Sequence, residues 1–226
     1  MREIVFDTET TGLDPRAGHR LVEIGCVEML NGAPSGATFH TYLNPERDMP
    51  VEAFQVHGLS EEFLFGQPLF ADKVEAFLEF VADARFVIHN AQFDMGFINA
   101  ELDRLGRPPL RNDVVDTVTL ARRKFPGQRA SLDALCERLG IDNAHRTRHG
   151  ALLDAELLAE VYIELTGGRQ RGFDLAGAPA ASDPAGAGAA SAATRAPRPH
   201  VASAAELAAH AAFLGKLKDP LWLKAE

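Results

Sequence analysis

Residues 4–13 read Ile4-Val5-Phe6-Asp7-Thr8-Glu9-Thr10-Thr11-Gly12-Leu13, a stretch that combines an apolar run with two closely spaced acidic residues. Its apolar start predicts a buried β-strand. In an extended chain, residues i and i+2 point to the same side, so Asp7 and Glu9 are expected to present two carboxylates together at the end of this strand. Two like charges at close range are costly unless a positive charge lies between them. Because Mg²⁺ and Mn²⁺ prefer oxygen ligands, the stretch predicts half of a site for a hard divalent cation.

The composition is that of an ordinary globular protein, and it limits the kinds of protein that the chain can be. A chain of 226 residues can form one sizeable domain with sequence left over. The net charge of −9 argues against binding nucleic acid through bulk electrostatics, although a local grip through bound cations is compatible with it. Cys26 and Cys136 are isolated, which predicts core residues and neither a disulfide nor a zinc site. No apolar run is long enough to cross a bilayer, and Met1-Arg2-Glu3 shows no signal-peptide pattern, so we expect a cytoplasmic protein.

Turn residues and apolar spacing predict the order of the elements. Strands are expected at Glu3–Asp7, Leu21–Leu30, Thr38–Leu43, Arg85–His89 and around Val114-Val115. Helices are expected at Asp72–Val81, Phe93–Leu105, a segment ending at Arg123, Leu132–Leu139 and Ala151–Thr166. Asn31-Gly32 marks a hairpin, and the residues through Gly36 predict a loop longer than two. Strands in a block, then strands alternating with helices, indicate an α/β domain over residues 1–168, with a mixed central sheet flanked by helices.

The remaining sequence predicts a tether and a docking segment. Residues 169–200 are expected to form a flexible linker, because Ala176–Pro199 consists almost wholly of Ala, Gly, Pro and Ser. Apolar residues then return at helical spacing within residues 201–226, with Trp222 near the end. An isolated helix of this length is marginal in water. We therefore expect a segment that docks on another protein, while a helix that folds back on its own domain stays an alternative.

The Asp7-x-Glu9 pair alone also fits a solvated acidic rim, and two later segments favour a metal site instead. In His89-Asn90-Ala91-Gln92-Phe93-Asp94 a strand ends and a helix begins, which places Asp94 in the first helical turn. The helix dipole favours an acid there, so Asp94 by itself could be structural. In His149-Gly150-Ala151-Leu152-Leu153-Asp154, the end residues would point about 140° apart on one helix. Both reach one site only if His149 lies on the preceding loop and Asp154 on the helix.

Four carboxylates and one histidine at one edge of a sheet are more than structural roles would require. Such a set can hold two metals about 3.5–4 Å apart, the arrangement used for in-line phosphoryl displacement. A loop-borne His149 suits a general base that takes a proton from the attacking water. The constellation therefore predicts phosphodiester hydrolysis. The nearby basic residues Arg146 and Arg148 are expected to contact phosphate, although such a run also fits a solvated face.

The series Asp7-x-Glu9, His89-Asn90-x-x-Phe93-Asp94 and His149-x-x-x-x-Asp154 resembles the DEDD superfamily of 3′→5′ exonucleases, in its histidine-bearing DEDDh branch. The resemblance covers residues 1–168, with all three motifs in order. Three longer matches, Phe6–Leu13, Val56–Leu59 and His149–Ala155, resemble more narrowly the proofreading members of bacterial replication.

The resemblance implies a ribonuclease-H-like sheet, two Mg²⁺ or Mn²⁺ ions, and removal of mispaired nucleotides from DNA 3′ ends. It implies metal ligation by Asp7, Glu9, Asp94 and Asp154, with Asp94 assisting, and His149 as the catalytic base. It also assigns substrate contact to Asp7, Glu9, Glu52, His57, Asp154 and the backbone near Thr10–Leu13, where Leu13 would wedge at the terminal base. His57 equally fits a turn residue bonded to its own loop. Phe93 fits a base-stacking residue or, on its spacing, a core residue.

The resemblance also gives the tail a partner. It implies that residues 201–226 bind the polymerase subunit, and Gln170–Leu175 is similar to a sliding-clamp binding peptide. Two alternatives remain at this point. One is a free-standing DEDDh exonuclease that trims RNA or oligonucleotides, and it shares every motif. The other is a non-catalytic binding module on a nuclease fold, which would predict the loss of a carboxylate or of His149, and none is missing.

Overall fold

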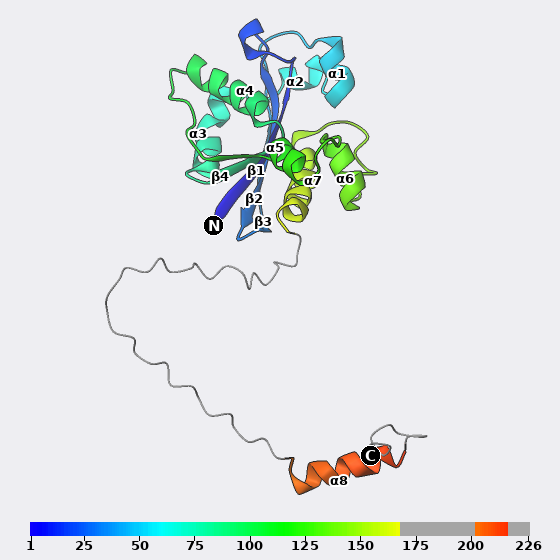
Figure 1. Ribbon diagram of the computed structural model, residues 1–226. Helices are drawn as coiled ribbons and strands as arrows, with labels where there is room; N and C mark the ends of the chain where they lie inside the picture. The colour runs from blue at the N-terminus through cyan, green and yellow to red at the C-terminus, as the bar shows by residue number, and fades with distance from the viewer. Residues whose placement is uncertain (168–201, 217–226) are drawn as a thin grey trace, which may run out of the picture. The chain divides into compact units, whose positions relative to one another are not determined.

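The computed structural model describes residues 1–167 and 202–216 (Figure 1). The strands are β1 Arg2–Thr10, β2 Leu21–Leu30, β3 Ala33–Tyr42, β4 Arg85–Ile88 and β5 Val114–Asp116. The first helices are the 3₁₀ helix η1 Pro15–Ala17, then α1 Val51–His57, α2 Glu61–Phe65 and α3 Phe70–Val81. They are followed by α4 Ala91–Arg104, α5 Thr117–Lys124, α6 Leu132–Leu139, α7 Ala151–Leu165 and α8 Ala204–Leu214.

The strands of residues 1–167 form one mixed sheet with the order β3-β2-β1-β4-β5. β1 is antiparallel to β2, and β2 is antiparallel to β3. β1 is parallel to β4, and β4 is parallel to β5, so these three strands end at the same edge of the sheet. The expected mixed α/β sheet flanked by helices is confirmed.

Alternation along β1 divides the core into two layers. Ile4 and Phe6 are fully buried on the face covered by α3 and α4, where they pack with residues such as Phe77 and Phe97. Val5 is buried on the opposite face, in a cluster that includes Leu158 of α7. Because side chains alternate, Asp7 and Glu9 continue the face of α7, and Thr8 continues the face of α4. The two buried cysteines fall one in each layer, as expected for core residues.

The hairpin between β2 and β3 corrects the expected long loop. Leu30 pairs with Ala33, so Asn31 and Gly32 alone form the turn. Both have positive φ, 54° and 82°, as in the two-residue turn whose twist matches the strands. The residues up to Gly36 that indicated a longer loop lie in β3 instead. Pro34 is tolerated there because β3 is an edge strand.

Several element bounds also differ from expectation. β1 runs through Thr10 instead of ending at Asp7, so Asp7 and Glu9 both lie within the strand. The short helices α1 and α2 have no counterpart in the sequence prediction. They are seven and five residues long, which is too short for a helical period to stand out.

The tail beyond residue 201 is described only for residues 202–216. Helix α8 begins with a capping box in which Ser203 and Glu206 bond each other's backbone N–H groups. Trp222, the linker and the clamp-like peptide Gln170–Leu175 lie outside the described residues. In the described ranges, no helix has the length and apolarity needed to cross a membrane.

Candidate active site

A cleft of about 820 Å³ lies where β1 and β4 end and where α4 and α7 begin. Apart from Arg146 and Arg148, which were expected to contact phosphate, the residues with a predicted catalytic, metal-binding or substrate-binding role line it: Asp7, Glu9, Glu52, His57, Asp94, His149 and Asp154. Residues up to 147 positions apart in the sequence, from Asp7 to Asp154, therefore meet in one cavity.

The place of Asp154 depends on a glycine in the neighbouring strand. Gly25 pairs with Asp7 across β1 and β2. A Cβ atom at Gly25 would lie 2.3 Å from both the Ala151 carbonyl carbon and the Leu152 amide nitrogen. The first turn of α7 therefore rests directly on the backbone of β2, a close approach that only glycine permits. This contact brings Asp154 over the end of β1, beside Asp7 and Glu9.

Asp94 reaches the cleft from the other face of the sheet. The Thr8 hydroxyl donates a 2.7 Å hydrogen bond to Asp94 Oδ1. Asn90, which precedes α4, has a left-handed backbone with φ 65°, so the chain turns sharply from β4 into the helix. Asp94 then lies in the first turn of α4, as predicted.

The carboxylates repel one another strongly. Burial, followed by the charge of Asp94, raises the pKa of Asp7 well above its ordinary value. Burial and the charge of Asp154 raise the pKa of Glu9 to about 8. Burial raises the pKa of Asp94 to about 7, although its hydrogen bond from Thr8 opposes the shift. Such a group of acids in a cleft is the electrostatic setting that a divalent cation would stabilise.

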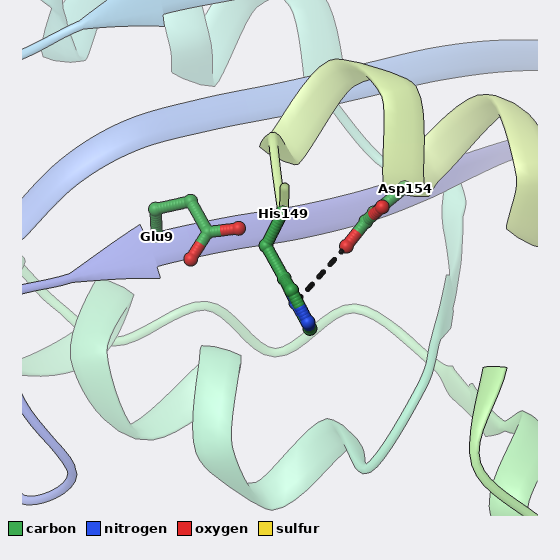
Figure 2. Close-up of side chains that lie close together, drawn as sticks. All are labelled: Glu9, His149 and Asp154. Atoms are coloured by element: carbon green, nitrogen blue, oxygen red, sulfur yellow. Dashed lines mark ion pairs between the residues drawn. The ribbon is translucent and has the colours of Figure 1, made fainter. Parts of the chain in front are cut away.

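His149 lies on the loop before α7, as predicted, and its side chain is 47% exposed. Figure 2 shows the side chains of Glu9, His149 and Asp154 facing a common space. Potential ligand atoms of these three residues lie within 4.8 Å of one another. The loop is anchored by the His149 amide, which donates to the Val56 carbonyl at 3.2 Å.

Arg146 corrects the expectation that it is available for phosphate. Its guanidinium makes a bidentate ion pair with Asp154, with Nε–Oδ1 at 2.6 Å and Nη2–Oδ2 at 2.7 Å. Nη1 binds Asp133 Oδ1 at 2.7 Å. The side chain is only 7% exposed, and its donors are taken up by the buried Asp154 and the exposed Asp133. Arg148 lies over the ring of Phe54, 5.7 Å from the ring centroid.

His57 offers a donor inside the cleft. Its Nδ1 accepts a 3.0 Å hydrogen bond from the Leu59 amide, which assigns the ring proton to Nε2. Burial lowers the pKa of His57, so the neutral ring is favoured. Nε2 is buried and makes no hydrogen bond of good geometry among the described residues, although the Thr10 backbone lies near enough to oppose the pKa shift. His57 therefore combines a hydrogen bond to its own turn with a donor that faces the cleft. Glu52, which lies earlier in α1, is exposed at the cleft.

Two hydrophobic residues at the cleft, Leu13 and Phe93, differ in solvent exposure and packing. Leu13 is 85% exposed, which leaves its side chain accessible to a ligand. Phe93 is partly buried against the core, and its ring packs 5.0 Å from that of Phe97. The core alternative for Phe93 therefore describes its packing well.

His89 lines the cleft although sequence reasoning gave it no role. The Thr117 hydroxyl donates to the Ile88 carbonyl at 3.2 Å, so it accepts from His89 Nδ1 at 2.9 Å. Burial lowers the pKa of His89. Its position directly after the buried strand β4 is the sequence signal that points to the cleft.

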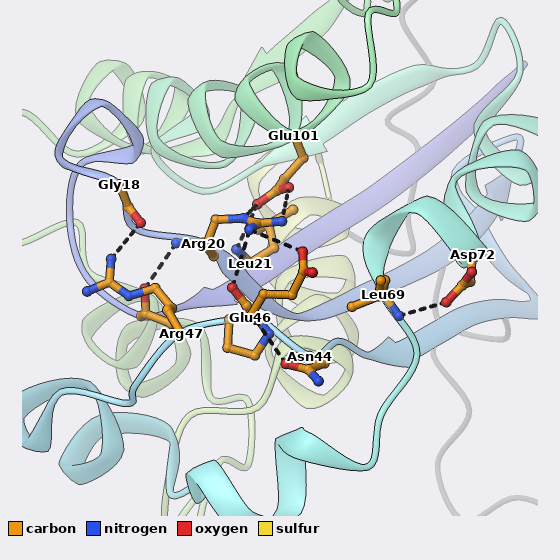
Figure 3. A network of polar contacts seen from close by, with 11 residues as sticks. Gly18, Arg20, Leu21, Asn44, Glu46, Arg47, Leu69, Asp72 and Glu101 are labelled. Atoms are coloured by element: carbon orange, nitrogen blue, oxygen red, sulfur yellow. Dashed lines mark hydrogen bonds and ion pairs between the residues drawn. The ribbon is translucent and has the colours of Figure 1, made fainter.

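A buried ion pair fixes the loop that follows β1 (Figure 3). Arg20 binds Glu101 of α4 through two contacts, Nε–Oε1 at 2.6 Å and Nη2–Oε2 at 2.9 Å. Arg20 Nη1 also donates to the Pro45 carbonyl at 3.3 Å. Arg47 donates to the Gly18 carbonyl at 2.5 Å from the same side. The loop that carries Gly12 and Leu13 to the cleft is thereby tied to α4 and to the segment after β3.

Comparisons with known proteins give the family. A family model described as "Exonuclease" matches residues 4–162. The DNA polymerase III subunit epsilon of Rickettsia felis is 54% identical over 179 residues, which cover 77% of this chain and 78% of that one. The DNA polymerase III subunit epsilon of Escherichia coli K12 is 49% identical over 176 residues, with coverage of 74% and 72%.

Solved structures support the fold. The nuclease domain of 3′hExo, a DEDDh family member solved with rAMP, superposes with a TM-score of 0.64 at 18% identity, and covers 73% of this chain and 91% of that one. Exonuclease X in complex with 5′ overhanging duplex DNA gives 0.57 at 24% identity, with coverage of 73% and 90%. These likenesses confirm the ribonuclease-H-like architecture. Together with the sequence matches, they show that the chain belongs to the exonuclease family, in the group of the DNA polymerase III epsilon subunits.

Proposed function

We propose that this exonuclease removes mispaired nucleotides from DNA 3′ ends by hydrolysing the terminal phosphodiester bond, as the proofreading subunit of DNA polymerase III. The observation that carries the proposal is the meeting of Asp7, Glu9, Asp94, Asp154 and His149 in one cleft. The relatives named above are polymerase III epsilon subunits, which supports the replicative setting.

The donor set fits hard divalent cations. Its ligand atoms are carboxylate oxygens, which Mg²⁺ and Mn²⁺ prefer. The pKa values of Asp7, Glu9 and Asp94 are raised, chiefly by burial, so added positive charge would stabilise their ionised forms. We propose that these three residues and Asp154 hold two such ions. When bound, the ions would supply charge stabilisation at the phosphate and lower the pKa of the attacking water.

Other residues of the cleft suit proton transfer and binding of the terminal nucleotide. His149 would accept the proton of the attacking water, because it lies beside Asp154 on an exposed loop. The Nε2–H group of His57 would donate to an oxygen of the terminal nucleotide, since it is buried at the cleft and makes no hydrogen bond of good geometry among the described residues. Glu52 would accept from a sugar hydroxyl, and Leu13 would contact the terminal base. The assignments of His57, Glu52 and Leu13 are tested by the loss of nucleotide affinity on substitution.

The proposed reaction is tested with two labelled DNA duplexes that differ only in a 3′-terminal mispair, and with an RNA strand of the same sequence. With Mn²⁺ or Mg²⁺, we expect single nucleotides to be released from the 3′ end, faster from the mispaired end than from the paired one. A chelator should stop the release. Equal digestion of RNA and DNA would instead favour a trimming exonuclease, and inactivity of the intact protein under all conditions would favour the non-catalytic module.

We further propose that residues 169–200 tether the exonuclease domain of residues 1–168 and that residues 201–226 bind the polymerase III alpha subunit. Helix α8 supports this, because its exposed Leu207 and Phe213 are apolar side chains available for docking. Tethering would raise the effective concentration of the nuclease at the primer end. Truncation after Leu175 should abolish co-purification with the alpha subunit and leave nucleotide release from free single strands intact.

Gln170–Leu175 is proposed as the sliding-clamp contact. If a variant in which these residues are replaced still bound the clamp, that role would be refuted.

A further inference from the structure

Arg146 supplies positive charge to the carboxylate cleft from just behind its wall. The described residues that line the cleft include neither lysine nor arginine. The charge of Arg146 nevertheless lowers the pKa of both Asp7 and Glu9, so it acts on the two carboxylates of β1 as well as on Asp154. Its own pKa is raised, chiefly by its hydrogen bonds to Asp154. Because a guanidinium does not lose its proton in proteins, this charge is permanent.

Both oxygens of Asp154 are engaged by this one side chain. Oδ1 accepts from Nε and Oδ2 from Nη2, in the parallel bidentate geometry that gives the strongest carboxylate hydrogen bonds. The carboxylate is 4% exposed and the guanidinium 7%, so water screens the pair weakly. Each oxygen keeps a second lone pair, so a cation bound at Asp154 would lie close to the guanidinium charge. The guanidinium thus already neutralises the carboxylate that a divalent ion would stabilise.

The same guanidinium also contacts the candidate base. Nη2 of Arg146 lies 3.0 Å from His149 Nδ1 and 3.4 Å from His149 Nε2, so the guanidinium lies close to both ring nitrogens. His149 Nδ1 in turn lies 3.4 Å from Asp154 Oδ2. Arg146 therefore contacts the candidate base and both oxygens of Asp154 at once.

We propose that Arg146 is a positioning residue that serves as an internal counter-ion: it neutralises Asp154 and holds it beside His149 in the absence of a divalent cation, and its positive charge opposes the binding of one. This rests on the cation site of the proposed function. Arg146 therefore weakens cation binding, because a cation at Asp154 is repelled by the guanidinium and competes with its ion pair.

Calorimetric titration of the full chain with Mn²⁺, without nucleic acid, tests the proposal. Arg146→Gln should bind Mn²⁺ about tenfold more tightly than the wild type, equivalent to about 1.4 kcal/mol. Arg146→Lys should fall between them, because lysine keeps the charge but lacks the bidentate fork. Arg138→Gln is the matched control, since it removes an equal charge from α6, where Arg138 bonds Gln128 and the Arg129 carbonyl. Its affinity should stay within twofold of the wild type.

The imidazole NMR signals of His149 give a second readout. In the wild type these signals should shift when diamagnetic Mg²⁺ is added. In metal-free Arg146→Gln they should differ from those of the metal-free wild type, because the guanidinium no longer contacts the ring. Unchanged or weaker Mn²⁺ binding by Arg146→Gln, with normal binding by the wild type, would overturn the counter-ion role alone. Absence of any Mn²⁺ binding by the wild type would overturn the proposed cation site itself, and the counter-ion role with it.

Discussion

Asp7→Asn is expected to abolish nucleotide release and, at the same time, to stabilise the metal-free protein. Activity should fall by at least about 10³-fold, because charge stabilisation by bound metal is worth several kcal/mol in such reactions and each 1.4 kcal/mol is tenfold. The free energy of unfolding should rise by roughly 1–4 kcal/mol near pH 8, since the change removes a buried carboxylate that three other acids repel. Nuclease assays and chemical denaturation of the same preparations measure the two effects.

Glu3→Gln is the matched control for Asp7→Asn. Glu3 lies on the same face of β1 and is also buried, but it accepts a hydrogen bond from Tyr162 at the other end of the strand. Its replacement should leave activity unchanged. Loss of stability in Asp7→Asn would contradict the electrostatic description of the cleft, and retained activity would contradict the cation site.

His149→Gln should slow hydrolysis while keeping Mn²⁺ affinity, because the ring is assigned as a base.

The metal-free wild type should lose stability relative to Glu9→Gln as the pH rises from about 4.5 to about 8. The pKa of Glu9 is about 8 in the folded protein, against an ordinary value of 4.5. Between these values the folded state binds more protons than the unfolded chain, so stability falls as the pH rises. The difference from Glu9→Gln should be small at pH 4.5 and reach at most about 5 kcal/mol at pH 9, since one pKa unit is worth about 1.4 kcal/mol. Denaturant unfolding at a series of pH values measures it.

Divalent cations provide the control for this pH dependence. Saturating Mn²⁺ should stabilise the wild type more at pH 8 than at pH 5, because the cation binds ionised carboxylates and competes with protons. Its effect on Glu9→Gln should be smaller. If the metal-free wild type and Glu9→Gln kept a constant difference across this range, the burial and repulsion assigned to Glu9 would be wrong.

The sequence predicted the parts of the site that follow from local geometry. The i, i+2 spacing of Asp7 and Glu9 placed both on one face of β1. The five-residue step from His149 to Asp154 required a loop followed by a helix, and the structure has both. Asp94 was placed correctly because the apolar run of β4 is followed at once by a helical pattern.

The features that the sequence did not predict depend on tertiary contacts. Arg146 looked available for phosphate because nothing in the local sequence indicates that its guanidinium meets Asp154. The support of α7 by Gly25 is equally invisible, since a glycine within a strand does not reveal which backbone approaches it. Pro34 and Gly36 were misleading in another way. They are turn residues in most settings, yet here they lie in an edge strand.

The contact between α7 and the sheet also bears on how the protein is made. Asp7 and Glu9 come from the first strand, whereas Asp154 arrives with the last helix of residues 1–167. A ribosome that has released only the first 150 residues has already delivered every strand of the sheet, but not the carboxylate that completes the cleft. A nascent chain therefore cannot assemble the full set of acids until α7 has emerged and settled on Gly25. With the proposed cation site, chains that end before α7 would lack nuclease activity, and activity would be gained only at the end of domain synthesis.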